Sequence, residues 1–196
     1  MEKRFSQKYY TLIIISVFLF LIQLNVTAAP LVLPRPVPLQ AETIAHLQQA
    51  HGNENSQWKL VVFGFTRCKD ICPTSLANLS MLVKAAEVEQ IKLNGIFVSI
   101  DPDRDTRAVL TDYTKSFGSD IAYLRFEDEE LERFKDEFGV ETIFLTKNEG
   151  NQVNYQVDHS TTAFLIDPEG RIKVMFDAVK DATSIAKLFQ ENRELF

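Results

Sequence analysis

The chain contains two cysteines, Cys68 and Cys72, which lie four residues apart in the stretch GFTRCKDICP. One intervening turn would bring both sulfur atoms close enough to form a disulfide or to hold one metal ion. Lys69 directly follows the first cysteine and Pro73 the second. These residue types predict thiol redox chemistry, metal binding, or a disulfide that fastens a turn.

The segments on either side place this cysteine loop at one edge of a sheet. The apolar run 58–65 predicts a strand buried on both faces, and residues 72–90 predict a helix. A loop between such a strand and helix lies at the carboxyl edge of an open α/β sheet, where ligand sites commonly occur. The positive end of the helix dipole and the cation of Lys69 would both favour the thiolate of Cys72. We therefore expect a lowered pKa for Cys72.

A third metal ligand would have to come from a different part of the chain. The histidines are His46, His51 and His159. The first two lie in a polar stretch and are expected to be surface residues. His159 ends VNYQVDH, directly before an apolar strand. The pattern leaves open whether His159 is a metal ligand or a hydrogen-bonded core histidine.

Carboxylates flank the candidate ligands. Asp70 lies between the cysteines and Asp158 directly precedes His159. Each could orient a ligand through a hydrogen bond, or could be a solvated or capping residue. A further charged cluster follows the strand expected at 95–100 and contains Asp101, Asp103, Arg104 and Asp105. This cluster is expected either to line the rim of the site or to cap a helix and form a local ion pair.

Residues 1–28 have the layout of an export segment. Lys3, Arg4 and Lys8 precede the apolar run 12–22, and small residues end at Ala28. This predicts a signal peptide cleaved after Ala28, or an uncleaved membrane anchor, because residues 9–29 just reach spanning length. In both cases the rest of the chain is exported, to a compartment where disulfides can persist.

The remaining pattern predicts an appendage and one domain. The stretch PLVLPRPVPL holds four of the seven prolines and is expected to be a stiff spacer. Residues 29–57 are therefore interpreted as a linker and an N-terminal segment of uncertain structure. A short helix is expected at 41–50. Residues 58–196 alternate strands with helices and end in a hairpin and a helix. This order predicts an α/β, thioredoxin-like fold, in which helices flank a central mixed sheet. The expected strands are 58–65, 95–100, 121–126, 161–166 and 171–176, and the expected helices are 72–90, 105–117, 128–138 and one near the C-terminus.

Composition narrows the classes of function. The 196 residues include 45% hydrophobic ones and carry a formal net charge of −6. Such a chain can bury a sizeable core. The acidic balance, without clustered Lys and Arg, argues against nucleic-acid binding.

Three motifs in order carry a family resemblance. GFTRCKDICPTSL, SIDPDRDT and VDHSTTAFLIDPEGRI resemble the Sco/SenC family, copper-binding thioredoxin-like proteins that help to assemble the binuclear copper centre of cytochrome c oxidase. The resemblance covers residues 58–196. It departs from the usual family pattern at Lys69 and Arg107, where the family usually has proline, and neither departure removes a ligand.

The resemblance implies a ligand set, a cargo and partners. The copper ligands would be Cys68, Cys72 and His159, and the cargo Cu(I) or Cu(II). Soft thiolates suit Cu(I), and the added imidazole also suits Cu(II). The partner would be the copper-bearing subunit of the oxidase, with other copper chaperones as further candidates. The family's N-terminal anchor implies a periplasmic or other extracytoplasmic domain tethered to the inner membrane.

Four functions remain to be compared. The first is a copper metallochaperone without catalytic turnover. The alternative is an enzyme, a thiol-disulfide reductase that acts on the oxidase cysteines through Cys68 and Cys72. A peroxidase fits the fold but leaves His159 without a role. A purely structural disulfide is weakly supported, because closing so short a loop constrains little chain entropy.

Overall fold

The computed structural model describes residues 30–52, 56–148, 150 and 153–196. The export segment predicted at residues 1–28 lies outside these described residues. Within them, every helix is too short or too polar to cross a membrane.

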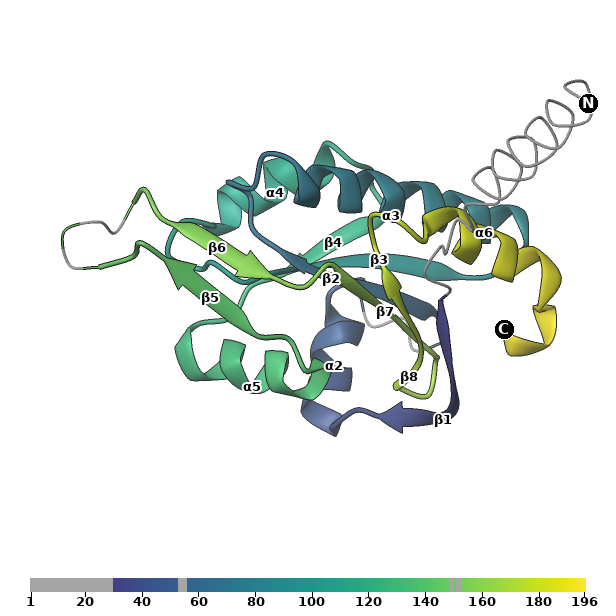
Figure 1. Cartoon of the computed structure of the whole chain (residues 1–196). Helices are drawn as coiled ribbons and strands as arrows, with labels where there is room; N and C mark the ends of the chain where they lie inside the picture. Colours follow the sequence, from purple (N-terminus) through teal and green to yellow (C-terminus); the bar gives the residue numbers. More distant parts are fainter. Residues whose placement is uncertain (1–29, 53–55, 149, 151–152) are drawn as a thin grey trace, which may run out of the picture.

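A six-stranded mixed sheet forms the centre of the domain (Figure 1). The strand order is β1-β8-β7-β2-β3-β4, in which β2, β3 and β4 are parallel and the other neighbours are antiparallel. The strands are β1 (Leu31–Pro38), β2 (Trp58–Gly64), β3 (Leu93–Ser99), β4 (Ile121–Leu124), β7 (Thr162–Ile166) and β8 (Arg171–Asp177). All seven residues of β2 are buried, as its apolar run predicts.

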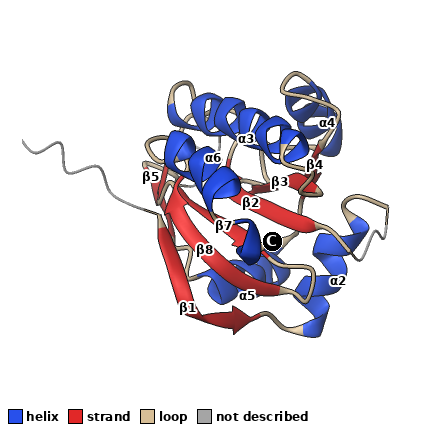
Figure 2. Ribbon diagram, turned by 90° about the vertical axis from the view of Figure 1, so that its right-hand side faces the viewer, coloured by secondary structure: helices blue, strands red, loops and turns tan. Residues whose placement is uncertain are grey.

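Helices cover both faces of this sheet (Figure 2). One face carries α3 (Ile71–Val88), α4 (Arg107–Lys115) and α6 (Ala182–Glu191), and the other carries α2 (Ala41–Gln49) and α5 (Asp128–Phe138). A short 3-10 helix, Arg193–Leu195, follows α6. Each face buries its own hydrophobic cluster against the sheet. The predicted central mixed sheet flanked by helices is confirmed.

The proline-rich segment differs from its expectation. It is extended, but it is not a spacer, because it forms the edge strand β1 and pairs with β8. Prolines are tolerated there because an edge strand has backbone groups that need no ladder partner, and the pairing register shifts between Val32 and Val37. The helix expected at 41–50 is confirmed as α2, whose Leu47 is only 2% exposed. Residues 30–49 thus belong to the folded domain.

A two-stranded hairpin that the sequence did not predict projects from one end of the sheet (Figure 1). It consists of β5 (Thr142–Leu145) and β6 (Gln156–His159), paired antiparallel. Each strand has four residues and alternates between half-buried and exposed positions, so neither shows the long apolar run that marked β2. The hairpin matters for function because His159 is its last residue.

Candidate metal centre

The cysteine loop connects the end of β2 to the start of α3, as predicted. A glycine is required at its start. A Cβ atom added to Gly64 would lie 2.9 Å from Cys72 Sγ and 2.7 Å from a ring carbon of Phe97. The bare backbone at Gly64 therefore makes the space that the Cys72 sulfur occupies.

Cys72 lies in the first turn of α3 and is only 2% exposed. The expected lowering of its pKa is wrong. Burial raises the pKa of the Cys72 thiol far above its ordinary range, and a hydrogen bond from the Phe65 backbone opposes this only in part. Lys69 is exposed and does not offset the desolvation. Burial thus favours the protonated form of Cys72, and a metal ion that binds the sulfur would displace this proton.

His159 brings an imidazole to this sulfur from the β5–β6 hairpin. Its Nε2 atom lies 3.9 Å from Cys72 Sγ. Its Nδ1 atom lies 2.8 Å from the Ser160 carbonyl oxygen, which can only accept, so Nδ1 carries the proton and donates it. Burial lowers the pKa of His159 and keeps the ring neutral. The unprotonated Nε2 atom is therefore free to bind a metal on the side of Cys72.

Cys68 completes the candidate ligand set less closely. Its sulfur accepts a hydrogen bond of 3.3 Å from the backbone N–H of Cys72, and neither thiol is in a disulfide. Within the described part of the chain, Cys68, Cys72 and His159 are not a group whose ligand atoms all lie within 4.8 Å of one another. Cys68 is half-buried on the loop and borders an open hollow of about 810 Å³. A rotation of its side chain would be needed to close the set.

The pair at Cys72 and His159 fits a shared metal ion. With bonds of about 2.3 Å to sulfur and about 2.0 Å to nitrogen, ligand atoms at trigonal angles lie about 3.7 Å apart. The observed 3.9 Å is close to this value. Two thiols and one imidazole form a soft donor set, which suits copper.

The charged cluster after β3 connects two of the segments that surround this site. Arg104 forms an ion pair with the buried Asp101 and donates through Nη1 to the Tyr155 carbonyl oxygen at 2.8 Å. Its guanidinium also lies 3.6 Å from the centre of the Tyr155 ring. The local ion pair expected here is confirmed. It links the loop after β3 to the hairpin that carries His159.

Asp105, a member of the charged cluster that the sequence singled out, does not cap a helix but is a buried positioning residue. It is fully buried and accepts hydrogen bonds from the Thr66 backbone N–H and hydroxyl and, at 2.7 Å, from the Ser99 hydroxyl. It thereby ties the cysteine loop to β3. The cap of α4 is Thr106 instead, whose hydroxyl accepts from Val109 N–H.

The carboxylates suggested to orient the ligands are both exposed. Asp70 stands at the N-terminal boundary of α3, but its side chain makes no capping hydrogen bond. Asp158 is next to His159, whose Nδ1 proton goes to the Ser160 carbonyl instead. Backbone, rather than carboxylate, orients the imidazole here.

The two other histidines are less exposed than expected. The His51 ring lies 2.9 Å from the Gly95 carbonyl oxygen. His46 packs against Phe126 and lies 3.5 Å from a carboxylate oxygen of Glu130. Neither belongs to the cysteine site.

Comparisons with known proteins place this chain among Sco proteins. The SCO1/SenC family model matches residues 46–192. The SCO2-like protein RP587 of Rickettsia prowazekii is 35% identical over 131 residues, which cover 67% of this chain and 63% of that protein. The chain thus spans less than two thirds of this relative.

Two solved structures share the fold with 28% identity. The structure of ScoI from Arabidopsis thaliana with copper bound superposes with a TM-score of 0.64, over 71% of this chain and 86% of the other. The apo Sco1 protein from Thermus thermophilus gives a TM-score of 0.65, over 84% and 95%. The predicted thioredoxin-like fold is confirmed by these likenesses.

Proposed function

Because this chain belongs to the SCO1/SenC family, we propose that it binds copper and serves cytochrome c oxidase assembly by delivering copper to, or maturing, the binuclear copper centre. The observation that carries the proposal is the approach of His159 Nε2 to Cys72 Sγ at 3.9 Å, with the proton of the imidazole held on the opposite nitrogen. A related plant protein holds copper on the same fold.

Copper is the cargo, and Cys68, Cys72 and His159 are its proposed ligands. The thiols give up their protons to the solvent when they bind the ion. Three protein ligands leave an open position, so a partner's ligands can enter and take the ion by exchange. The half-buried Cys68 next to the open hollow supports entry from that side. The proposed partner is the copper-bearing subunit of the oxidase.

The reductase alternative is less well supported. It needs a thiolate near neutral pH. Burial raises the pKa of the Cys72 thiol and disfavours its thiolate, which leaves Cys68 as the better candidate for the attacking residue. Disulfide exchange through Cys68 and Cys72 would also leave His159 without a role.

Replacing His159 with alanine tests the chaperone proposal. We expect the reduced His159→Ala chain to lose tight Cu(II) binding and its sulfur-to-copper absorption in an anaerobic titration, while its circular dichroism stays unchanged. His51→Ala, which also removes one imidazole, is the matched control and should bind Cu(II) like the parent. Equal Cu(II) binding by His159→Ala would remove the main support. Disulfide-reductase turnover retained in that variant would favour the enzyme.

We further propose that the domain is exported and held at the inner membrane, on the periplasmic or extracytoplasmic side. The basic residues Lys3, Arg4 and Lys8 before an apolar run support this orientation. Cell fractionation followed by alkaline extraction measures it. An anchored chain stays with the membrane pellet at full length, a cleaved one is shorter and soluble, and recovery in the cytoplasm would contradict both.

A further inference from the structure

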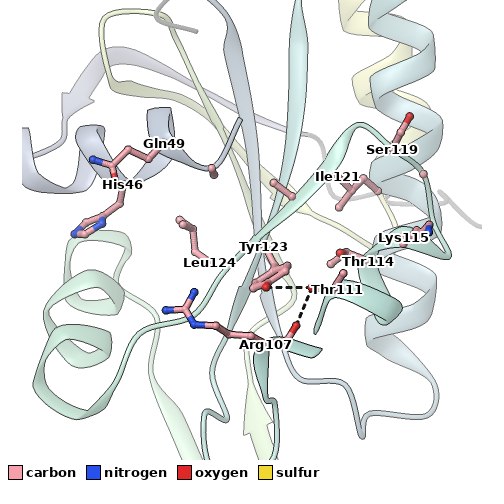
Figure 3. Close-up of a pocket in the computed structure, with 13 residues that line it drawn as sticks. His46, Gln49, Arg107, Thr111, Thr114, Lys115, Ser119, Ile121, Tyr123 and Leu124 are labelled. Carbon is pink, nitrogen blue, oxygen red and sulfur yellow. Dashed lines mark hydrogen bonds between the residues drawn. The ribbon is translucent and has the colours of Figure 1, made fainter. Parts of the chain in front are cut away.

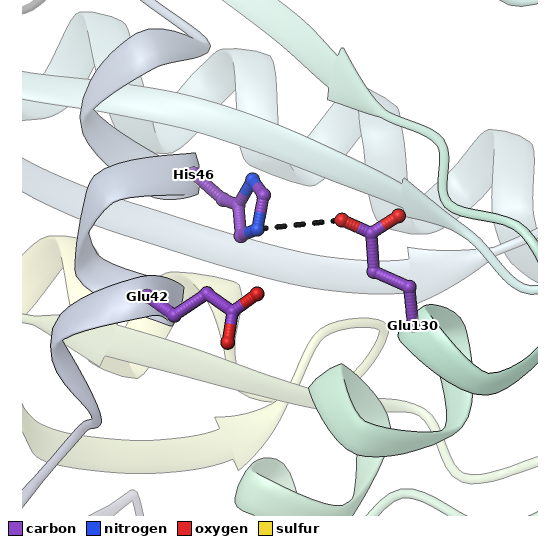
Figure 4. Close-up of side chains that lie close together, drawn as sticks. All are labelled: Glu42, His46 and Glu130. Carbon is purple, nitrogen blue, oxygen red and sulfur yellow. Dashed lines mark ion pairs between the residues drawn. The ribbon is translucent and has the colours of Figure 1, made fainter.

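A second group of metal-ligating side chains lies between α2 and α5 (Figure 4). Glu42 and His46 are four residues apart on α2 and so lie on one side of that helix. Glu130 faces them from the first turn of α5. One ligand atom from each of the three residues lies within 4.8 Å of the other two, and His46 Nε2 is 3.5 Å from a Glu130 oxygen.

The imidazole of His46 is held in place by packing. Its ring lies edge-on to Phe126, with ring centres 4.9 Å apart, and edge-on to Phe134 at 6.4 Å. The side chain is 26% exposed. Because aromatic rings fix its orientation, its Nε2 atom is directed toward the carboxylates without a further loss of freedom on binding.

The spacing of the two helices is also fixed. Glu137 on α5 accepts hydrogen bonds from the Gln40 backbone N–H at 3.0 Å and from the Thr43 hydroxyl at 2.9 Å. Leu47, at 2% exposure, anchors α2 in the core. The three candidate ligands therefore stand on elements that are already locked together, which favours a preorganised site.

The charge of the group is unbalanced. Within the described residues, neither Glu42 nor Glu130 forms an ion pair with a lysine or arginine, and the nearby Arg133 pairs with Glu129 instead. Both carboxylates lie in first helical turns, where the helix dipole favours negative charge. The imidazole of His46 is the partner that the structure shows for Glu130, and a ligand atom of Glu42 lies within 4.8 Å of both.

The surroundings give access from one side. A hollow of about 400 Å³, lined partly by Glu42, His46 and Glu130, opens to solvent beside the group. The hollow on the other side of His46, about 540 Å³, is lined by the cations Arg107 and Lys115 (Figure 3). His46 is the one metal-ligating side chain among the residues of that second hollow, so an ion would enter from the acidic side.

We propose that Glu42, His46 and Glu130 bind a divalent transition-metal ion of the zinc type. Zinc is held by imidazole nitrogen at about 2.0 Å and by carboxylate oxygen at about 2.1 Å, which places tetrahedral ligand atoms about 3.4 Å apart. The 3.5 Å between His46 and Glu130 has this spacing. A small rotation of the exposed Glu42 closes the set, and water from the hollow supplies the fourth ligand.

This site would differ chemically from the cysteine site. Two carboxylates and one imidazole are borderline to hard donors, so they select a divalent ion over Cu(I), whereas thiolates prefer Cu(I). The inference goes beyond the proposed copper function and does not depend on it. A simple ion pair between a protonated His46 and Glu130 is the competing explanation, and zinc binding distinguishes the two.

The test uses the full chain without a polyhistidine tag and with the first site disabled by Cys68→Ser, Cys72→Ser and His159→Ala together. Zn²⁺ is added in calorimetric and thermal-unfolding titrations. We expect uptake of one Zn²⁺ per chain and a rise of the melting temperature with zinc concentration, because the ion binds the folded state. Co²⁺ in place of Zn²⁺ should give an absorption spectrum of nitrogen and oxygen ligands without a sulfur charge-transfer band.

Isosteric variants assign the ligands. In this background, Glu42→Gln and Glu130→Gln should each weaken Zn²⁺ binding by at least roughly tenfold, as expected when a group at a metal site is lost. Glu129→Gln removes the same charge from the same turn and should leave binding within about twofold. Circular dichroism without metal confirms that each variant is folded. The proposal is overturned if the background chain takes up no zinc, or if Glu129→Gln weakens binding as much as Glu130→Gln.

Discussion

His159 and His46 are both partly buried imidazoles packed against phenylalanine rings, but their neighbours differ in kind. His159 lies 3.9 Å from a sulfur atom, and its Phe65 contact is at 6.1 Å between ring centres. His46 lies 3.5 Å from a carboxylate oxygen. The same side chain therefore belongs to a soft donor set in one place and a harder one in the other. The neighbours, more than the histidine, decide which metal each region suits.

The two regions also differ in how the fold supports them. The cysteine site depends on buried packing, because Cys72 occupies a space between β2 and Phe97 that only glycine at position 64 leaves open. The second candidate site, formed by Glu42, His46 and Glu130, lies on two helices, α2 and α5, at the surface. Substitutions near the cysteine site should therefore lower both the stability and the metal affinity. Substitutions near Glu42, His46 and Glu130 should leave the fold largely intact.

Gly64→Ala tests this comparison and should have the largest effect on stability. The added methyl would meet Cys72 Sγ at 2.9 Å and a Phe97 ring that is 1% exposed and cannot move aside. We expect a loss of about 3 kcal/mol in the free energy of unfolding, the upper part of the range for overpacking. Copper binding should weaken because the sulfur is displaced. Urea unfolding and an anaerobic copper titration measure the two effects.

Gly139, at the C-terminal end of the helix that carries Glu130, serves as the control. Gly139 ends α5 at a φ of +62°, and an added Cβ would meet no atom within 4 Å. Gly139→Ala should cost about 1 kcal/mol through backbone strain alone, with no change in copper binding. If Gly64→Ala cost no more than Gly139→Ala and kept its copper affinity, the packing around the sulfur would not constrain the site.

Sequence reasoning predicted the regular part of the molecule well. The long apolar run of β2, the glycine after α5 and the turn between β7 and β8 each have a local signature, and the structure confirms those elements. The short strands β5 and β6 have none, because each is half-exposed and is stabilised by its partner rather than by its own pattern. The role of β1 was missed for a similar reason. Its prolines indicate an extended chain, but only the available edge of β8 makes it a strand.

For the candidate site, the ligand roles stay a prediction although the structure brings Cys72 and His159 together, and the expected pKa of Cys72 was wrong. Spacing and the family resemblance pointed to Cys68, Cys72 and His159. The protonation state of Cys72 depends on how deeply the sulfur is buried, and burial outweighs the helix terminus and the exposed Lys69. The packing at Gly64, the hydrogen bonds from Thr66 to Asp105 and the approach of Glu130 to His46 depend on contacts between segments distant in sequence, which no local pattern contains.

A further pair of effects, both smaller than that of Gly64→Ala, concerns one carboxylate in each region that ties two segments together. Asp105 fastens the cysteine loop to β3 from a fully buried position, and Glu137 fastens α2 to α5 from a half-buried one. Asp105→Asn places an amide group against the Thr66 donor and should lower the free energy of unfolding by about 2 kcal/mol. Glu137→Gln should lower it by about 0.5 kcal/mol, because water can replace part of the lost hydrogen bonding.

The stabilising effect of Asp105 should also depend on pH. Burial raises the pKa of Asp105, although hydrogen bonds from Thr66 and Ser99 oppose the shift. A raised folded-state pKa gives stability that is complete below the unfolded-state pKa and is lost as the pH rises through the folded-state value. The advantage of the parent over Asp105→Asn should therefore be larger in acid than at neutral pH, as measured by urea unfolding at both. An advantage that grows toward neutral pH, or a Glu137→Gln cost equal to that of Asp105→Asn, would show that burial does not distinguish these two carboxylates.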